Sequence, residues 1–141
     1  MEAKVTFSQG LQFVGRADSG HALVMDGPVR VGGSDSAPRP SELLLLALAG
    51  CTGMDVVSIL RKKRQQVSGM EITVSGEQKA DHPARFEKLA VTYVIRGEGI
   101  DPEAVRRAIQ LSEEKYCSVG ATLREGVEIT SGFEILHPEE A

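Results

Sequence analysis

Tryptophan is absent from this sequence of 141 residues, and cysteine occurs only twice. Two cysteines at distant positions give no zinc-binding spacing, and they are too few for a small secreted domain that several disulfide bonds stabilise. In a reducing compartment they are either buried core residues or redox-active thiols. No glycine-rich loop carries the lysine of a Walker motif or the third glycine of a Rossmann motif, so we expect no nucleotide cofactor.

Acidic residues outnumber lysine and arginine by 20 to 16, and histidine is scarce. The net charge is −4 at pH 7, whereas binding to nucleic acids or anionic membranes needs a basic surface, so we expect neither partner. The three histidines, His21, His82 and His137, form no HExxH or i, i+4 pair, so we expect no metal site. The N-terminus lacks the basic-then-apolar pattern of a signal peptide, which favours a cytoplasmic protein.

Hydrophobic residues at 41% and charged residues at 26% are ordinary values for a globular domain. Strand-like and helix-like periodicities predict an α+β fold in a single domain, residues 1–141. The expected elements are N-terminal strands within 1–33, a central helix over 40–65, a long antiparallel strand pair over 70–98, a second helix over 101–115 and a last strand over 126–136.

The most apolar segment, residues 43–60, reads LLLLALAGCTGMDVVSIL. It reaches the lower length limit for a membrane span, but Asp55 would then lie inside the hydrocarbon at a cost of about 3 kcal/mol. A soluble helix that is buried on several sides is the better interpretation. Gly50 and Gly53 each weaken a helix by about 1 kcal/mol relative to alanine. Either another helix approaches closely there, or these small residues pack in a core around an inert Cys51.

Two segments, PSELLLLALAGCTGMDVVSIL at 40–60 and LSEEKYCSVGATL at 111–123, resemble the signature segments of the OsmC/Ohr family of thiol peroxidases. They are most similar to its YhfA-like branch, and the strand order agrees with the family along nearly the whole chain. The resemblance implies an OsmC-like intertwined homodimer, in which antiparallel sheets wrap around two long central helices.

The resemblance also implies a chemistry. Cys51 would attack an organic hydroperoxide or hydrogen peroxide and become a sulfenic acid, which Cys117 would resolve as a Cys51–Cys117 disulfide. A dithiol would then reduce this disulfide, and no cofactor is needed. The second cysteine matters because a sulfenic acid without a nearby thiol over-oxidises irreversibly.

Cys51 needs a cation in order to react, because the nucleophile is the thiolate. It lies well inside the predicted helix, where the N-terminal dipole has faded, and Asp55 one turn away opposes a negative charge. In the family that the sequence resembles, the cation is an arginine held by a glutamate near the helix start. The candidate arginines are Arg30 and Arg16, and the candidate glutamate is Glu42, which is equally well a helix-capping carboxylate.

Two functions remain open at this point. The first is a cysteine peroxidase that reduces hydroperoxides. The second is a non-catalytic or weakly catalytic family member that binds a small apolar or thiol-reactive ligand at the dimer interface. The separation of the two cysteines discriminates between them, because a disulfide needs Cβ atoms about 4 Å apart.

Overall fold

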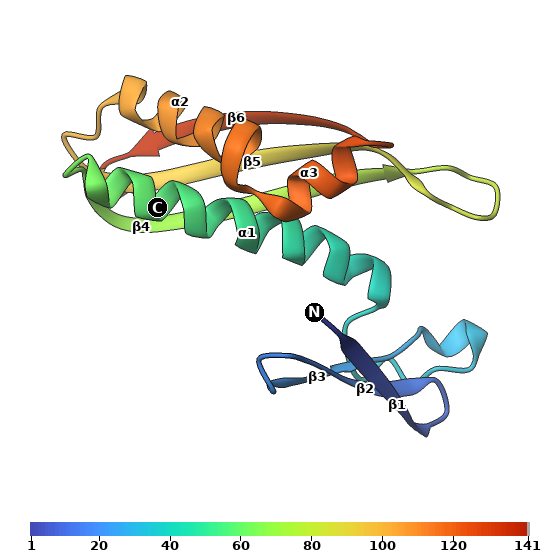
Figure 1. Cartoon of the computed structure of the whole chain (residues 1–141). Coiled ribbons are helices and arrows are strands. Elements are labelled where there is room, and N and C mark those ends of the chain that lie inside the picture. Colours follow the sequence, from blue (N-terminus) through green and yellow to red (C-terminus); the bar gives the residue numbers. More distant parts are fainter. Residues whose placement is uncertain (141) are drawn as a thin grey trace. The chain divides into compact units, whose positions relative to one another are not determined.

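The α+β fold is confirmed by a computed structural model of the chain, which describes residues 1–140. It contains two three-stranded sheets and three α-helices (Figure 1). The chain forms two compact units, of which the first is Met1–Leu44 and the second begins at Leu45. The long helix begins in the first unit and continues through the second, where it carries Cys51.

The first unit is an antiparallel meander. Its strands are β1 (Ala3–Gln9), β2 (Gln12–Ala17) and β3 (Ala22–Met25), with β2 in the middle. The connection between β1 and β2 needs the left-handed conformation, and Gly10 supplies it with a φ of 57°. No residue of β1 is buried, and the side chains of Val5 and Phe7 are among the exposed large hydrophobic groups of this unit.

One carboxylate organises the loop after β3. Asp26 accepts hydrogen bonds from the backbone N–H groups of Gly27 (2.7 Å), Ser34 (3.2 Å) and Ser36 (3.1 Å), and from the Ser36 hydroxyl (2.6 Å). These bonds, that of the Ser36 side chain first, lower the pKa of Asp26 to about 2. The ionised carboxylate of Asp26 therefore holds together the loop that leads into the long helix.

Helix α1 (Pro40–Lys62) has a clear start and stop. Pro40 fixes a helical φ at the first position, and the carbonyl of Arg39 accepts the first helical bond, from the Leu43 N–H (3.2 Å). The carboxylate of Glu42 reaches back to the Arg39 N–H (3.0 Å), which is one half of a capping box. The helix ends before the predicted Gln65, because Arg64 adopts a left-handed φ of 58°.

The second unit contains a mixed sheet. Strands β4 (Gln66–Gln78) and β5 (Phe86–Glu98) form the predicted antiparallel pair, and β6 (Glu128–Leu136) pairs with the other edge of β5. One edge differs from the expected antiparallel sheets, because β6 runs parallel to β5. A parallel neighbour needs a crossover connection. Helices α2 (Pro102–Leu111) and α3 (Ser118–Arg124) form it.

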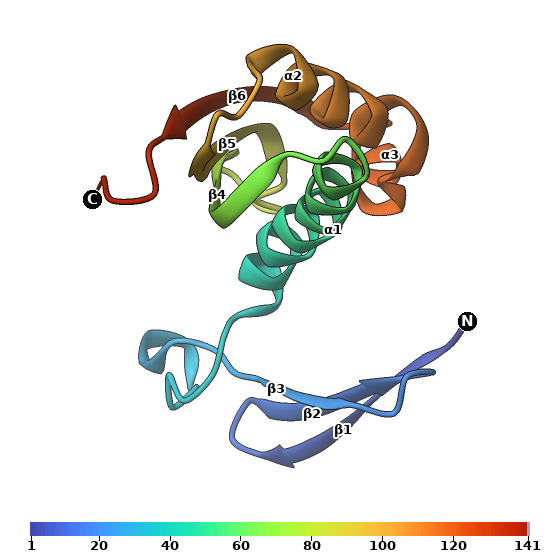
Figure 2. The ribbon, with the colours of Figure 1, turned by 90° about the vertical axis from the view of Figure 1, so that its left-hand side faces the viewer.

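The helices cover one face of this sheet (Figure 2). Strand β5 alternates strictly, and its inward side chains Leu89, Val91, Tyr93 and Ile95 are buried. They meet a stripe of α1 at i, i+4 spacing, formed by Leu48, Thr52, Val56 and Leu60, and a second stripe of α2 that includes Val105 and Ala108. Each fully buried aliphatic side chain stabilises this core by about 1.5–3 kcal/mol.

Side chains on the opposite side of α1 are left exposed by residues 1–140. Leu46 is 60% exposed and Met54 is 76% exposed. An 18-residue window of α1 has a mean hydropathy of 2.1, so by length and composition this helix could span a membrane. A core helix passes the same test, and α1 is a core helix along its buried stripe.

The two glycines of α1 have different surroundings. A Cβ atom at Gly53 would lie 2.7 Å from the Cδ1 atom of Ile72, so the helix approaches β4 closely there. At Gly50 a Cβ would meet no atom within 4 Å. The sequence predicts the close approach of another helix at these glycines, but at Gly53 the neighbour is strand β4 of the same chain, and no atom of the described residues fills the space at Gly50.

Candidate functional site

The first cysteine lies in the middle of α1. Cys51 is half-buried and precedes Thr52, which belongs to the buried stripe of the helix. Asp55 follows Cys51 by four residues, so both side chains lie on the same side of α1, one turn apart. Helix α1 therefore presents a thiol and a carboxylate side by side at the edge of the core.

The second cysteine is placed by an irregular turn. Helix α2 starts with Asp101 as N-cap, and after Leu111 it continues as one turn of π-helix, Ser112–Tyr116. The Cys117 N–H donates to the Ser112 carbonyl (2.8 Å), which closes this wide turn. Cys117 then caps α3, because its Sγ atom accepts a hydrogen bond from the Gly120 N–H (3.2 Å).

These two segments bring three reactive groups together. The Sγ atoms of Cys51 and Cys117 and a carboxylate oxygen of Asp55 all lie within 4.8 Å of one another. Both cysteines are free thiols, and Cys117 is 4% exposed. We call these three residues the Cys–Asp–Cys cluster. All three belong to the second unit, so the cluster is a property of one compact body.

The environment of Cys117 favours its neutral form. Burial raises the pKa of the Cys117 thiol to about 11, and the hydrogen bond from Gly120 only partly opposes this. A hydrogen bond with Cys51 and the negative charges of Cys51 and Asp55 are smaller contributions to the same rise of the pKa. Cys117 is therefore a protonated thiol at neutral pH.

A chain of buried hydroxyl groups ends on Asp55. The Tyr93 hydroxyl lies 2.6 Å from Thr52 Oγ1, which lies 2.9 Å from Ser112 Oγ, and Ser112 donates to Asp55 Oδ2 (2.9 Å). Each hydroxyl has one proton, so donation by Ser112 fixes the direction of the chain: Tyr93 donates to Thr52, and Thr52 to Ser112. The chain orients the carboxylate, and burial raises the pKa of Tyr93, which keeps its proton.

One cation lies beside the buried thiol. A Cβ atom at Gly120 would lie 3.0 Å from Arg124 Nη1 and 3.3 Å from Cys117 Sγ, so the absence of a side chain at Gly120 gives both groups room. The guanidinium of Arg124 is already paired: Nη1 donates to the Glu113 carbonyl (3.2 Å) and Nη2 lies 3.9 Å from its carboxylate. Ser131 also donates to Glu113 (2.6 Å).

The predicted activating residues lie in the first unit. Arg16 is an exposed residue of β2, and Arg30 is exposed in a single 3₁₀ turn, Val29–Val31. Neither forms an ion pair with any of residues 1–140. Glu42 binds the backbone and the side chain of Arg39, so in this chain it acts as the capping carboxylate that its position also predicts.

Sequence reasoning missed five residues around the cluster: Thr52, Tyr93, Ser112, Glu113 and Arg124. Thr52 could have been found, because it is the only polar member of the buried i, i+4 stripe of α1. Tyr93 occupies an inward position of an alternating strand, where a hydroxyl needs a partner. Glu113 and Arg124 carry no such signal, because the π-helical turn that brings them together has no evident sequence pattern.

Residues 33–132 match the family of OsmC-like proteins. The chain belongs to the OsmC family. It is 40% identical to protein YhfA of Escherichia coli over 136 residues, which cover 96% of this chain and 98% of that protein. The predicted resemblance to the YhfA-like branch is therefore confirmed.

Solved structures share the OsmC fold over the same length. A protein from Aquifex aeolicus superposes with a TM-score of 0.85 at 30% identity, covering 98% of this chain and 97% of that one. An organic hydroperoxide resistance protein from Legionella pneumophila superposes with a TM-score of 0.67 at 17% identity, covering 94% and 95%. The second likeness is one of fold alone.

Proposed function

We propose that this OsmC-family protein is a cysteine-based peroxidase that reduces organic hydroperoxides or hydrogen peroxide. The observation that carries the proposal is the Cys–Asp–Cys cluster, which holds the two sulfur atoms within 4.8 Å of each other. Two free thiols at this distance can be oxidised as a pair. Family membership supports a redox or peroxide-resistance role, and the Legionella neighbour bears a hydroperoxide resistance name.

The reaction has two steps in which atoms and electrons balance. The thiolate of Cys51 attacks one peroxide oxygen, the O–O bond breaks, and the products are a sulfenic acid and an alcohol, or water from hydrogen peroxide. Cys117 then attacks the Cys51 sulfur as its proton leaves, water departs, and a disulfide forms. A dithiol reductant restores both thiols by exchange and becomes a disulfide itself.

Burial supports this assignment of roles. Cys51 is half-buried, so a peroxide can reach it, whereas Cys117 is buried and protonated. A protonated thiol is a poor first nucleophile but is well placed to meet a sulfenic acid that forms beside it. Cys51 is therefore the peroxidatic residue in this proposal, and Cys117 is the resolving residue.

A cavity offers room for the organic part of a substrate. It has a volume of about 340 Å³, and its walls include Asp55, the apolar side chains of Ile59 and Leu111, and the ring of Tyr116. Asp55 belongs both to this wall and to the Cys–Asp–Cys cluster. Lys62 and Lys63 also line the cavity, so a hydroperoxide with an anionic end would find a partner there.

Peroxide consumption with a dithiol reductant tests the proposal. Cys51→Ser should abolish consumption, whereas Cys117→Ser should still consume about one equivalent of peroxide and stop as a sulfenic acid. The initial oxidation, followed with a sulfenic acid reagent, separates the two variants. Equal loss of this first step in both variants, or no consumption by the unmodified protein, would contradict the assignment.

A second test concerns the cation. If a homodimer places Arg30 of one chain near Cys51, Arg30→Ala should slow the attack on peroxide by about 10- to 100-fold, which corresponds to about 1.4–2.7 kcal/mol of thiolate stabilisation. Arg16→Ala is the matched control and should slow the attack less. The rate of alkylation of Cys51 against pH measures the effect without peroxide. An unchanged profile in both variants would remove the two arginines from the mechanism.

One observation favours a second candidate function. The first unit has an apolar cavity of about 450 Å³, with Val5, Leu11, Phe13 and Met25 in its walls. Such a cavity suits a small apolar ligand, as expected for a family member that binds without turnover. Binding of an apolar dye that survives Cys51→Ser, together with no peroxide consumption, would favour this alternative.

A further inference from the structure

The Cys–Asp–Cys cluster has the composition of a metal site that contains no histidine. Thiolates are soft ligands that select cations such as Zn²⁺, and a carboxylate oxygen often completes a zinc site. Cys51 and Asp55 come from one turn of α1, and Cys117 comes from the start of α3. Two ligands at i, i+4 on a helix and a third from another segment are a common arrangement in zinc proteins.

From this geometry we propose that Cys51, Asp55 and Cys117 together bind a divalent thiophilic cation of the Zn²⁺ class, with one coordination position left open. A tetrahedral zinc ion has bonds of about 2.3 Å to sulfur and about 2.0–2.2 Å to oxygen, which keeps its ligand atoms about 3.3–3.8 Å apart. The three ligand atoms already lie within 4.8 Å of one another, so binding requires a contraction of about 1 Å.

The carboxylate is prepared for this role. Its Oδ2 atom accepts the hydrogen bond from Ser112, and Asp55 forms no ion pair with any of residues 1–140. The other oxygen is therefore available to a cation. Metal-binding carboxylates are usually held by such hydrogen bonds. Here the Tyr93–Thr52–Ser112 chain supplies them from the core.

Charge and access are also favourable. In the free protein the buried Cys117 keeps its proton, whereas in the complex a divalent cation would compensate the negative charges of two thiolates and one carboxylate. Binding releases the two thiol protons to solvent and transfers no electrons. The cavity beside Asp55 provides a path for the ion and space for a water molecule at the open position.

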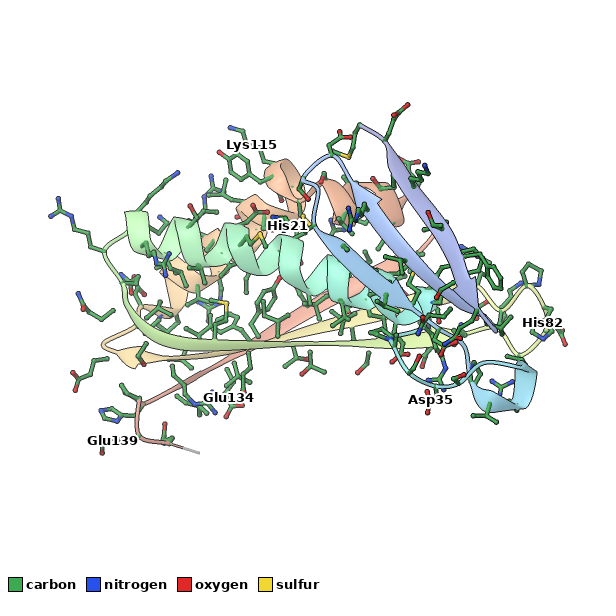
Figure 3. The ribbon with its side chains drawn as sticks, turned by 90° about the horizontal axis from the view of Figure 1, so that it is seen from below. His21, Asp35, His82, Lys115, Glu134 and Glu139 are labelled. Atoms are coloured by element: carbon green, nitrogen blue, oxygen red, sulfur yellow. The ribbon has the colours of Figure 1, made fainter. Side chains whose placement is uncertain are left out.

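No histidine belongs to this cluster. His82 lies on the loop between β4 and β5 (Figure 3), and His137 pairs with Glu98 (3.5 Å). Among residues 1–140, the Cys–Asp–Cys cluster is the only group of three or more potential metal ligands this close together. A metal bound at one equivalent per chain is thus expected at the two cysteines.

Cobalt titration of the reduced protein, without oxygen or peroxide, tests the proposal. We expect one equivalent of Co²⁺ per chain, with thiolate charge-transfer absorption and the strong visible bands of a tetrahedral ion, and displacement by Zn²⁺. Cys51→Ser, Cys117→Ser and Asp55→Asn should each weaken binding by more than about 10-fold, and Ser112→Ala by about 10- to 100-fold. Asp81→Asn, an exposed carboxylate in the hairpin loop, is the matched control and should bind as the unmodified protein does.

A second measurement covers the case in which a variant does not fold. In the unmodified protein, oxidation of the two thiols to a disulfide should abolish cobalt binding, and a phosphine reductant should restore it. Cobalt bound without charge-transfer absorption, or bound equally before and after oxidation, would be surface binding and would overturn the proposal. The site needs only reduced thiols and does not rest on peroxide reduction. Cobalt binding without peroxide consumption would refute only the peroxidase.

Discussion

At the scale of single residues, burial makes the Cys117 thiol a weak acid, and the Arg124–Glu113 pair lies beside it. The guanidinium lies next to Cys117, yet the pKa of this thiol is raised to about 11. Burial is the main cause of the raised pKa, and Arg124 does not offset it because Glu113 already pairs with the guanidinium. Cys117 is consequently held in the neutral form that suits a resolving residue. A substitution that removes the carboxylate of Glu113 would leave the charge of Arg124 uncompensated beside this thiol.

We therefore predict that Glu113→Gln lowers the pKa of Cys117. The amide oxygen of the new side chain can still accept from Ser131, but it no longer neutralises Arg124, so the thiolate of Cys117 gains a cationic neighbour. Alkylation of Cys117 in the Cys51→Ser background, followed against pH, should show a lower midpoint with Glu113→Gln than without it, and burial should keep both midpoints above the ordinary value of a thiol.

The matched control is Glu114→Gln, which removes an exposed carboxylate from the adjacent position. It should leave the alkylation profile of Cys117 unchanged, because Glu114 accepts from Gln110 and not from Arg124. Equal shifts in both variants would mean that net charge, and not the release of Arg124, controls the thiol.

The cysteines and the glutamate that the sequence predicted all lie in recognisable local sequence patterns. Cys51 and Cys117 were recognisable because they stand in two signature segments, and Glu42 could be interpreted as a cap because Pro40 marks the helix start. The arginine beside Cys117 was not recognisable. Arg124 reaches it through a π-helical turn, whose extra residue per turn shifts every following side chain, and no periodicity indicates such a turn.

At the scale of elements, periodicity predicted the strands and helices but not every pairing. The alternation of β4 and β5 and the short loop between them predicted an antiparallel pair, because a hairpin allows no other arrangement. The direction of β6 was not predictable in this way. Strand β6 pairs with the edge of β5 that β4 leaves free, and it reaches this edge through α2 and α3. The path of these two helices across the sheet depends on how they pack in the core, which the local pattern does not indicate.

The loop after β3 gives the prediction that belongs to this scale. Because hydrogen bonds lower the pKa of Asp26 from 3.8 to about 2, its ionised form stabilises the folded state. This contribution is fully present above about pH 4 and is lost as the pH falls through about 2. In thermal unfolding measured from pH 7 to pH 2, the fall of the midpoint that Asp26 causes should appear between about pH 4 and pH 2.

In the Asp26→Asn variant this part of the acid dependence should be absent, and the unfolding midpoint at pH 7 should be lower. An amide oxygen cannot replace a carboxylate that accepts four hydrogen bonds from its own loop. Asp81→Asn in the hairpin loop is the control and should follow the unmodified protein. If the unfolding midpoints of the two variants depended on pH in the same way, the carboxylate of Asp26 would not be the group that stabilises this loop.

At the scale of the whole molecule, each unit exposes apolar side chains that a soluble protein normally covers. In the first unit these include Val5, Phe7 and Leu23, and in the second Leu46 and Met54 of α1. Open space at Gly50 lies on the same helix. A second copy of the chain is the partner that the family resemblance implies, and it would allow the two central helices to pack against each other.

We predict an obligate homodimer, and a charge on the uncovered side of α1 should weaken it. Met54→Glu places a carboxylate where an apolar neighbour is expected, and the cost of burying it should raise the dissociation constant by at least about 10-fold, or about 1.4 kcal/mol. Ala80→Glu is the matched control, because it makes the same kind of change at an exposed position of the hairpin loop. Sedimentation of the unmodified protein, Met54→Glu and Ala80→Glu at micromolar concentration measures the difference. A folded monomer in the unmodified protein would exclude the dimer, and with it the supply of Arg30 from a partner chain. The Cys–Asp–Cys cluster would remain, because a single chain assembles it.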